Sequence, residues 1–263
     1  MITLTKSKFG IMKSCPRCFW WEMNKGLKRF EGPQSRLANA ADDRIKNHFD
    51  RFRARGDLPP ELQNDSYTGK LYPNQTLLNE WRLAQKGLVY LDASTGITLK
   101  GVFDDLLQEE EATIVLDYKT VSKNPKNFTI EKLKEDINDY DYTFQLELYT
   151  AILKLNGHKT KPYGYLLFYC LGELDSKGNP TFHTILVKIN LDLSRIKDYT
   201  EVALRILAPP EPPQPGINKN KQTNKYEICG FCISNEERNN FNSVKYEEEL
   251  TGVKRLSIED IEV

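Results

Sequence analysis

The sequence contains no uninterrupted apolar run approaching the ~20 residues that a membrane-spanning helix needs. Its first eight residues contain no apolar stretch of the kind found in secretion signals, and the chain has no internal repeat and no long low-complexity tract. Hydrophobic residues make up 39% and charged residues 28% of the 263 positions, which excludes a disordered chain. We therefore expect a cytoplasmic globular protein with one sizeable core or two small ones.

The chain also has no net charge, because 37 Lys and Arg residues balance 37 Asp and Glu residues. The distribution is nevertheless uneven: residues 1–55 carry 13 basic and five acidic side chains, an excess of +8. The segment from Glu236 to the end carries eight acidic and four basic side chains. A basic segment on a neutral protein is typical of a surface that binds a polyanion. The excess charge by itself agrees equally well with an ordinary solvated surface.

The hydrophobic pattern predicts a mixed α/β fold. Apolar residues at helical spacing predict helices at 9–25, 39–55, around 77–83, 144–155 and 193–207. Apolar and β-branched runs predict strands at 88–91, 97–107, 112–119, 164–170 and 182–189. The polar stretch 121–142 indicates a surface flap. This order predicts a central mixed sheet flanked by helices, with an N-terminal helical part. We assign one domain to 1–235, with a Pro-rich linker at 209–226, and an acidic tail to 236–263.

Five cysteines are present, and four of them form two Cys-x-x-Cys pairs, Cys15 with Cys18 and Cys229 with Cys232. In a reducing compartment two such pairs indicate a bound metal rather than disulfides. The spacing lets both thiolates of a pair reach one tetrahedral centre, and zinc and iron–sulfur both accept four thiolates. Cys170 ends an apolar strand, so we expect it in the core.

A second group of residues carries oxygen and nitrogen donors on the predicted central hairpin. Asp104 closes a Gly-x-x-Asp motif, and Asp117 and Lys119 form an Asp-x-Lys motif whose two side chains share one face of a strand. Two carboxylates and a lysine beside a cleft are what a Mg²⁺-dependent phosphodiesterase needs. Gln145 and Tyr149 lie four apart on a predicted helix and therefore on one face. Asp-x-Lys alone is a weak signal, because an ion pair at a strand end produces it too.

The three motifs together, in this order, resemble those of the RecB-type branch of the PD-(D/E)XK nuclease superfamily. The opening segment 14–19, Ser-Cys-Pro-Arg-Cys-Phe, resembles the Cys-Pro-Arg-x-Phe element of the same branch, which includes CRISPR-associated adaptation nucleases and helicase–nuclease subunits. The resemblance covers roughly residues 7–233. It implies a restriction-endonuclease-like core with a C-terminal segment held by the cysteines.

The resemblance also implies a role for each matching residue. Asp104 and Asp117 would bind Mg²⁺ or Mn²⁺ with the main-chain carbonyl of Tyr118, Lys119 would be the catalytic lysine, and Gln145 and Tyr149 would line the cleft.

The family often places a metal-binding histidine on an early helix, and this sequence departs from that pattern. We choose Asp42, one turn before Lys46, as the further ligand, with Asp43 and His48 as alternatives.

The cysteines depart from the family as well. In the resembling nucleases one cysteine of the first element joins three near the C-terminus around a 4Fe–4S cluster, whereas here two cysteines lie at each end. On the resemblance we favour a 4Fe–4S cluster, with Zn²⁺ as the alternative.

The resulting hypothesis is a Mg²⁺- or Mn²⁺-dependent deoxyribonuclease, exo- or endonucleolytic, that acts in DNA repair, recombination or CRISPR-type processing. Its partners would be DNA and a helicase or other DNA-processing protein, and we expect no membrane association. The alternative is a catalytically silent nucleic-acid-binding or adaptor module, which would have no reason to keep Asp104, Asp117 and Lys119 together. A third hypothesis, a zinc protein without a nucleic-acid role, leaves the excess positive charge unexplained.

Overall fold

The computed structural model describes residues 2–29, 36–65, 67–121, 130–178, 180–219 and 225–233. The chain forms two compact units, and each is described by itself. Unit 1 draws on Met1–Pro33 and Ser194–Arg255, and unit 2 draws on Gln34–Leu193 and Leu256–Val263. Across the described ranges, every helix is too short or too polar to cross a bilayer. The predicted acidic tail at 236–263 lies outside the described residues.

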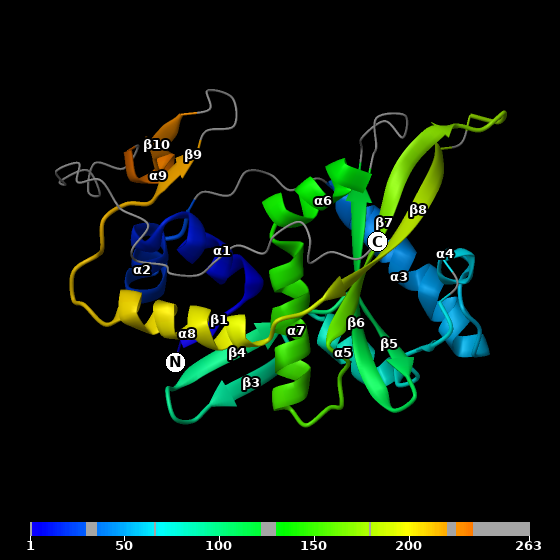
Figure 1. Ribbon diagram of the computed structural model, residues 1–263, viewed down its shortest axis with the longest axis horizontal. Coiled ribbons are helices and arrows are strands. Elements are labelled where there is room, and N and C mark those ends of the chain that lie inside the picture. Colours follow the sequence, from blue (N-terminus) through cyan, green and yellow to red (C-terminus); the bar gives the residue numbers. More distant parts are fainter. Residues whose placement is uncertain are drawn as a thin grey trace. The chain divides into compact units, whose positions relative to one another are not determined.

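Unit 2 is built on a five-stranded mixed sheet (Figure 1). In order across the sheet, the strands are β2 (Lys70–Leu71), β5 (Asp105–Glu109), β6 (Ala112–Val121), β7 (Tyr163–Leu174) and β8 (Pro180–Asn190). β6 and β7 run parallel, and the other neighbours are antiparallel. The helices of this unit are α3 (Arg36–Arg55), α4 (Pro60–Asn64), α5 (Gln75–Arg82), α6 (Ile130–Asp139) and α7 (Tyr142–Leu155). The predicted central mixed sheet flanked by helices is thereby confirmed.

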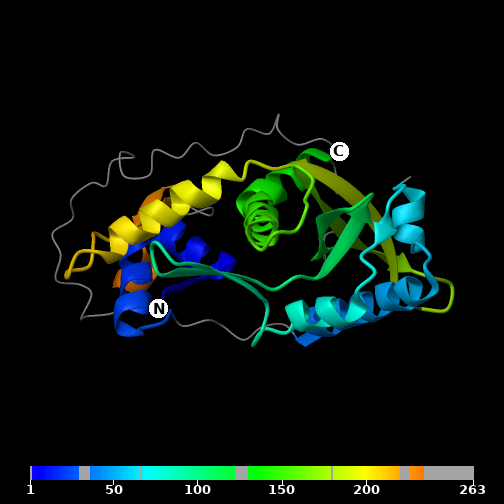
Figure 2. The ribbon, with the colours of Figure 1, turned by 90° about the horizontal axis from the view of Figure 1, so that it is seen from below.

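Helices cover both faces of this sheet, and Figure 2 shows α3 and α7 on opposite sides of it. Ile45 and Phe49 of α3 pack in one cluster with Leu116 and Tyr118 of β6. Because successive side chains of a strand point to opposite faces, Asp117 points to the face that α7 covers. α6 and α7 together supply the long connection that two parallel strands require.

The prediction of a single strand at 97–107 is wrong, because residues 102–104 interrupt it. Its first part, β4 (Ile97–Gly101), pairs with β3 (Leu88–Asp92) in a separate antiparallel hairpin, and its second part is β5. The break follows Gly101, where an added Cβ would lie 3.0 Å from the Tyr149 ring of α7. This close approach of the strand to the helix is a tertiary feature that the local pattern did not contain.

The surface flap predicted at 121–142 is also partly wrong. Residues 122–129 lie outside the described residues, but 130–139 form α6. Leu133 and Ile137, four positions apart, are fully buried, so the polar residues between them belong to the outer face of an amphipathic helix.

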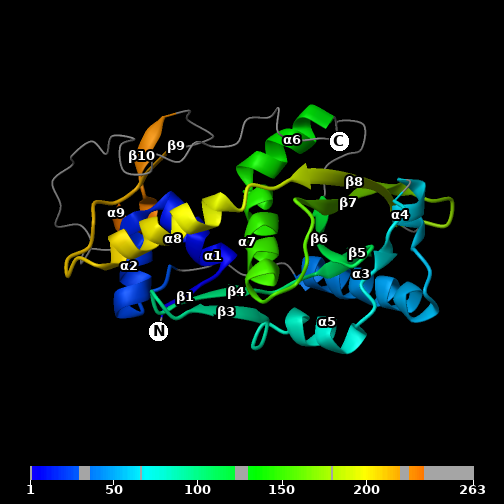
Figure 3. The same cartoon turned by 60° about the horizontal axis from the view of Figure 1, so that its bottom comes forward.

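Unit 1 contains a helical part and a small hairpin. Its elements are β1 (Ile2–Leu4), α1 (Lys6–Ser14), α2 (Pro16–Lys25), α8 (Ser194–Leu207), β9 (Ile217–Lys219), β10 (Tyr226–Ile228) and α9 (Gly230–Ile233). Figure 3 shows α8 beside α1 and α2, and Tyr199 packs edge-on against Phe9 there. The one helix predicted at 9–25 is two helices, because Cys15 is extended (φ −161°, ψ 103°) ahead of Pro16. A residue before proline is sterically disfavoured in the helical region.

Candidate functional site

The carboxylates of Asp104 and Asp117 meet on the β5–β6 hairpin. The register pairs Asp105 with Leu116, which brings the preceding Asp104 opposite Asp117. The Tyr118 amide donates a hydrogen bond to Asp104 Oδ2 at 3.1 Å and fixes that side chain. The Asp117 side chain is 1% exposed and that of Asp104 is 21% exposed, so one carboxylate is buried and the other faces solvent in part.

Lys119 lies beside Asp117 on the same face of β6, as the two-residue spacing predicts. Its ammonium group forms an ion pair with Asp117 and donates to Gln145 Oε1 at 3.2 Å. It also lies 4.4 Å from the centroid of the Tyr142 ring. Burial alone would lower the pKa of Lys119, but the carboxylates of Asp117 and Asp104 outweigh it and raise the pKa. Lys119 therefore keeps its positive charge at neutral pH.

α7 adds two polar side chains to this group. Gln145 Nε2 donates to Asp117 Oδ1 at 2.6 Å and lies 3.4 Å from the Tyr149 hydroxyl, one helical turn further on. Burial, followed by the charges of Asp117 and Asp104, raises the pKa of Tyr149, which therefore stays a neutral phenol. The predicted placement of Gln145 and Tyr149 on one helix face beside the carboxylates agrees with this geometry.

α3 places Asp42 near Asp104, with the Lys46 ammonium group between the two carboxylates. Lys46 Nζ lies 3.0 Å from Asp104 Oδ1 and 2.5 Å from Asp42 Oδ2. Asp43 is exposed on the next position of the helix. His48 lies 3.2 Å from Glu61 of α4. Of the three alternatives for the further ligand, the structure thus places Asp42 with Asp104 and places His48 elsewhere.

The environments of the two carboxylates push their pKa values apart. Burial, reinforced by the charge of Asp104, raises the pKa of Asp117 to about 7. Burial would raise the pKa of Asp104 too, but the ammonium groups of Lys46 and Lys119 outweigh it and lower the pKa. Asp117 therefore binds a proton more readily than Asp104 does, and a cation bound there would compete with that proton.

Oxygen donors of this kind fit Mg²⁺ or Mn²⁺. Mg²⁺ is usually held by one or two carboxylates while it keeps several waters. Asp104 and Asp117 supply two carboxylates, and Asp42 reaches Asp104 through Lys46 rather than directly. Tyr118, whose carbonyl was the predicted further ligand, lies in β6 between Asp117 and Lys119. The predicted roles of all these residues stay predictions.

A buried charge network lies behind the carboxylates, on the sheet face that α3 covers, and the sequence analysis missed it. Asp105 is fully buried and forms ion pairs with Arg53 and Arg82, while the Tyr118 hydroxyl donates to it at 2.6 Å. Arg82 Nε also donates to the main-chain carbonyl of Asp104 at 2.8 Å. The available signal was the Asp104–Asp105 doublet, because neighbouring strand residues face opposite sides of a sheet.

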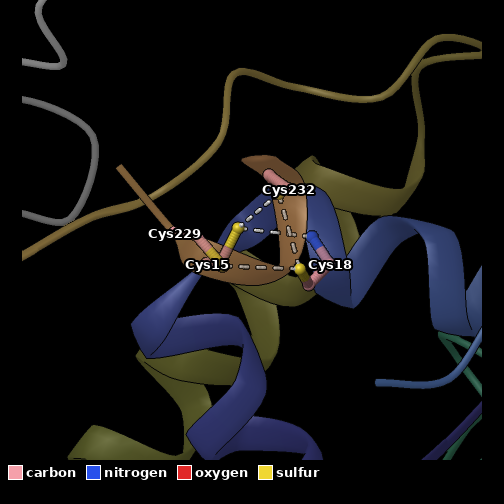
Figure 4. A group of neighbouring side chains, drawn as sticks. All are labelled: Cys15, Cys18, Cys229 and Cys232. Carbon is pink, nitrogen blue, oxygen red and sulfur yellow. Dashed lines mark hydrogen bonds between the residues drawn. The ribbon is translucent and has the colours of Figure 1, made fainter. Parts of the chain in front are cut away.

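The second candidate site is in unit 1, where the four paired cysteines converge (Figure 4). Cys15 precedes α2 and Cys18 lies in its first turn, while Cys229 precedes α9 and Cys232 lies within it. Their sulfurs all lie within 4.8 Å of one another, and each side chain is at least 95% buried. The prediction that the two pairs share one place is confirmed. Cys170 is buried in β7 of unit 2, as expected of a core residue.

Hydrogen-bond donors point at two of the sulfurs. Contacts among the four sulfurs lower the pKa of Cys15 and Cys229 and raise the pKa of Cys18 and Cys232. The Gly216 amide donates to Cys15 Sγ at 3.1 Å, and Arg29 Nη2 donates to Cys229 Sγ at 3.6 Å. Donors of this kind hold metal ligands in place and offset the negative charge of a thiolate set. Four such sulfurs form a possible metal site.

Comparison with known proteins identifies the class. The model of the PD-(D/E)XK nuclease superfamily matches residues 7–235, and the chain therefore belongs to this superfamily. A search of curated proteins gives no match. One solved structure similar to the chain, described as "Crystal structure of SSO0001", shares 14% sequence identity and a TM-score of 0.39, with 78% of this chain and 76% of that chain covered. Membership of the superfamily suggests a metal-dependent nuclease.

Proposed function

We propose that the chain is a Mg²⁺- or Mn²⁺-dependent deoxyribonuclease whose active centre is formed by Asp104, Asp117 and Lys119. The observation that carries this proposal is the buried Asp117 carboxylate, held between Lys119 and Gln145 and opposite Asp104. A buried carboxylate with a raised pKa next to a specific charge partner is typical of functional sites. The superfamily to which the chain belongs supports the same conclusion.

Each side chain of the centre has a task that follows from its surroundings. A bound divalent cation would polarise the scissile phosphate and lower the pKa of a bound water. Asp117 must lose its proton to become a ligand. Lys119, which stays charged, stabilises the negative charge that develops on the phosphate. Gln145 orients the Asp117 carboxylate, and Tyr149, which stays protonated, offers a hydroxyl donor beside it.

DNA is the proposed substrate, and the RecB-like branch with its CRISPR-associated members is the proposed relationship. The order of the motifs supports this branch, as does the Cys-Pro-Arg-Cys-Phe element at 15–19. The basic excess of residues 1–55 supports a polyanion, although Arg53 is internal to the buried network. We propose a role in DNA repair, recombination or CRISPR-type processing with a helicase or other DNA-processing partner. We expect this role in the cytoplasm, where thiols stay reduced.

One observation favours the silent-module alternative. Lys119 is paired with Asp117 and Lys46 with Asp104, so the charges of the two carboxylates are balanced without a divalent cation. A module that binds nucleic acid without cleaving it would need no further ligand at this place.

A cleavage assay separates the two proposals. Labelled single-stranded and double-stranded DNA would be incubated with the chain in Mg²⁺, in Mn²⁺ and in EDTA, with an Asp117→Ala chain as control. The nuclease hypothesis expects cleavage by the wild-type chain in either cation, and none in EDTA or with the variant. DNA binding without cleavage under every condition would support the silent module and overturn the nuclease.

A further inference from the structure

The distances between the four cysteine sulfurs distinguish a site for one metal ion from a site for a cluster. Cys15 Sγ and Cys232 Sγ are 3.6 Å apart, Cys18 Sγ and Cys232 Sγ are 3.6 Å apart, and Cys18 Sγ and Cys229 Sγ are 3.7 Å apart. These three of the six sulfur pairs are in contact and all six lie within 4.8 Å, although the sulfurs come from two segments more than 200 positions apart in the chain.

A single tetrahedral ion requires nearly this spacing. Zinc binds cysteine sulfur at about 2.3 Å in a tetrahedron, and the edge of such a tetrahedron is about 3.8 Å long. The three shortest edges, 3.6, 3.6 and 3.7 Å, differ from this value by about 0.1–0.2 Å, and the other three are at most 4.8 Å long. The four sulfurs therefore need a shift of about 1 Å or less along any edge to accept one ion at their centre.

An iron–sulfur cube requires a different spacing. Each of its four irons carries its own cysteine thiolate, and each thiolate extends outward from a different corner. The thiolates are then separated by the whole cube and cannot be in contact with one another. The observed sulfur set does not fit the 4Fe–4S cluster that the family resemblance implies.

We infer that the four-cysteine centre takes one Zn²⁺ and has a structural role. A closed set of four thiolates without an open position is characteristic of structural zinc. Among divalent metals, zinc binds such a set more tightly than ferrous iron does. This inference is independent of the proposed nuclease, because the two sites lie in different units and use different donors.

The surroundings of the sulfurs oppose their separation. An added Cβ at Gly216 would lie 2.3 Å from the Ser14 carbonyl oxygen and 2.7 Å from Cys15 Cα, so this segment packs directly on the Cys15 turn. The Gly216 carbonyl also accepts a hydrogen bond from the Cys229 amide at 2.8 Å. Gly216 thus links the two cysteine pairs. A separation of the two backbone segments by the width of a cluster would break this link.

The experiment offers the chain both metals. The full chain would be expressed with added iron and zinc and purified without oxygen. A second sample would be stripped of metal and reconstituted anaerobically with iron, sulfide and zinc together. Elemental analysis gives the metal content per chain, and visible absorption at about 400 nm detects an iron–sulfur cluster. Cys232→Ser and Cys170→Ser chains serve as the ligand variant and its matched control.

We expect one zinc per chain and no colour in the wild-type and Cys170→Ser chains, and at least a tenfold loss of zinc affinity in Cys232→Ser. Cobalt added in place of zinc should give the intense visible bands of a tetrahedral thiolate site. A brown chain with several irons and matching sulfide would overturn the inference, as would a single iron retained in the presence of zinc. Four freely reactive thiols with no metal in either preparation would overturn it as well.

Discussion

The two candidate sites of this chain are assembled in opposite ways. The carboxylate site comes mainly from one hairpin and the helix that follows it, between Asp104 and Tyr149, and its charges are already balanced by lysines. The cysteine site joins two segments of unit 1 that are far apart in the sequence and places four sulfurs within 4.8 Å of one another. The first site is shaped by the surrounding protein. The second, on our inference, depends on a bound metal for its cohesion.

The largest effect is expected at the inferred zinc site. Cys232→Ser removes one of four proposed ligands and should weaken zinc binding at least tenfold, and structural zinc contributes apparent free energies of about 10–16 kcal/mol in small domains. The melting temperature of the chain should fall, and protease should cut within 209–226. Cys170→Ser changes an equally buried cysteine outside the site and should change neither property beyond a small packing cost. Equal metal content in the two variants would contradict this prediction.

The carboxylate site, by contrast, depends on the buried charge network behind it. Arg82→Gln leaves Asp105 and Asp50 with fewer partners, and breaking a buried ion pair in this way costs about 3–5 kcal/mol of unfolding free energy. Urea denaturation measures the loss. Arg55→Gln is the matched control, since that arginine pairs with Asp57 at the surface and should change the same quantity by about 1 kcal/mol or less. Similar losses of unfolding free energy in both variants would show that the buried network stabilises the fold no more than a surface ion pair does.

A catalytic effect measured separately from any stability effect would sharpen the comparison further. Lys119→Ala should lower the cleavage rate about 10²–10³-fold, the usual result of removing one group that stabilises transition-state charge. Lys86→Ala removes an exposed lysine paired with Glu80 and should leave the rate unchanged. Rates on labelled DNA and melting curves of each chain separate the two effects. Undiminished cleavage by Lys119→Ala would remove this residue from the site.

The smallest effect is a pH dependence of the metal-free chain. Burial and Asp104 raise the pKa of Asp117 to about 7, above its value of about 3.9 in an unfolded chain. The folded state therefore binds a proton that the unfolded state has released. The associated stabilisation is complete below about pH 4 and is lost as the pH rises through about 7.

Urea denaturation in EDTA measures this dependence. The unfolding free energy of the wild-type chain, taken relative to Asp117→Asn, should fall between pH 4 and pH 8. The expected size is on the order of a few kcal/mol at most. A constant difference across that range would mean that Asp117 titrates normally.

The local parts of the molecule could be predicted from the sequence. Alternating and helical periodicities gave β3, β6, β7, β8, α3, α5 and α7 of unit 2. The two-residue spacing put Asp117 and Lys119 on one face of a strand, and the family resemblance put Gln145 beside them. The meeting of the cysteines was predictable for a chemical reason, because two thiolates alone do not complete a tetrahedral site. The interruption of the helix at Cys15 could also have been predicted, since the next residue is proline.

The remaining features depend on contacts that no local pattern contains. The break follows Gly101, where the Tyr149 ring of a distant helix leaves little room for a side chain. Asp105 is stable in the core because Arg53 and Arg82 arrive from two separate helices. Sequence periodicity reports which face of an element is apolar. It does not report which distant charge will meet a buried one.

The long separation between the two cysteine pairs also delays the assembly of their shared site during protein synthesis. Cys18 and Cys229 are 211 positions apart, and a ribosome that adds about 5–20 residues per second needs about 10–40 seconds to pass from one to the other. During this interval the first two thiols have left or are leaving the ribosome without the other half of their site. Maturation of the centre is therefore a late event, and the nascent chain passes through a stage in which its early thiols are exposed to oxidants and competing metals.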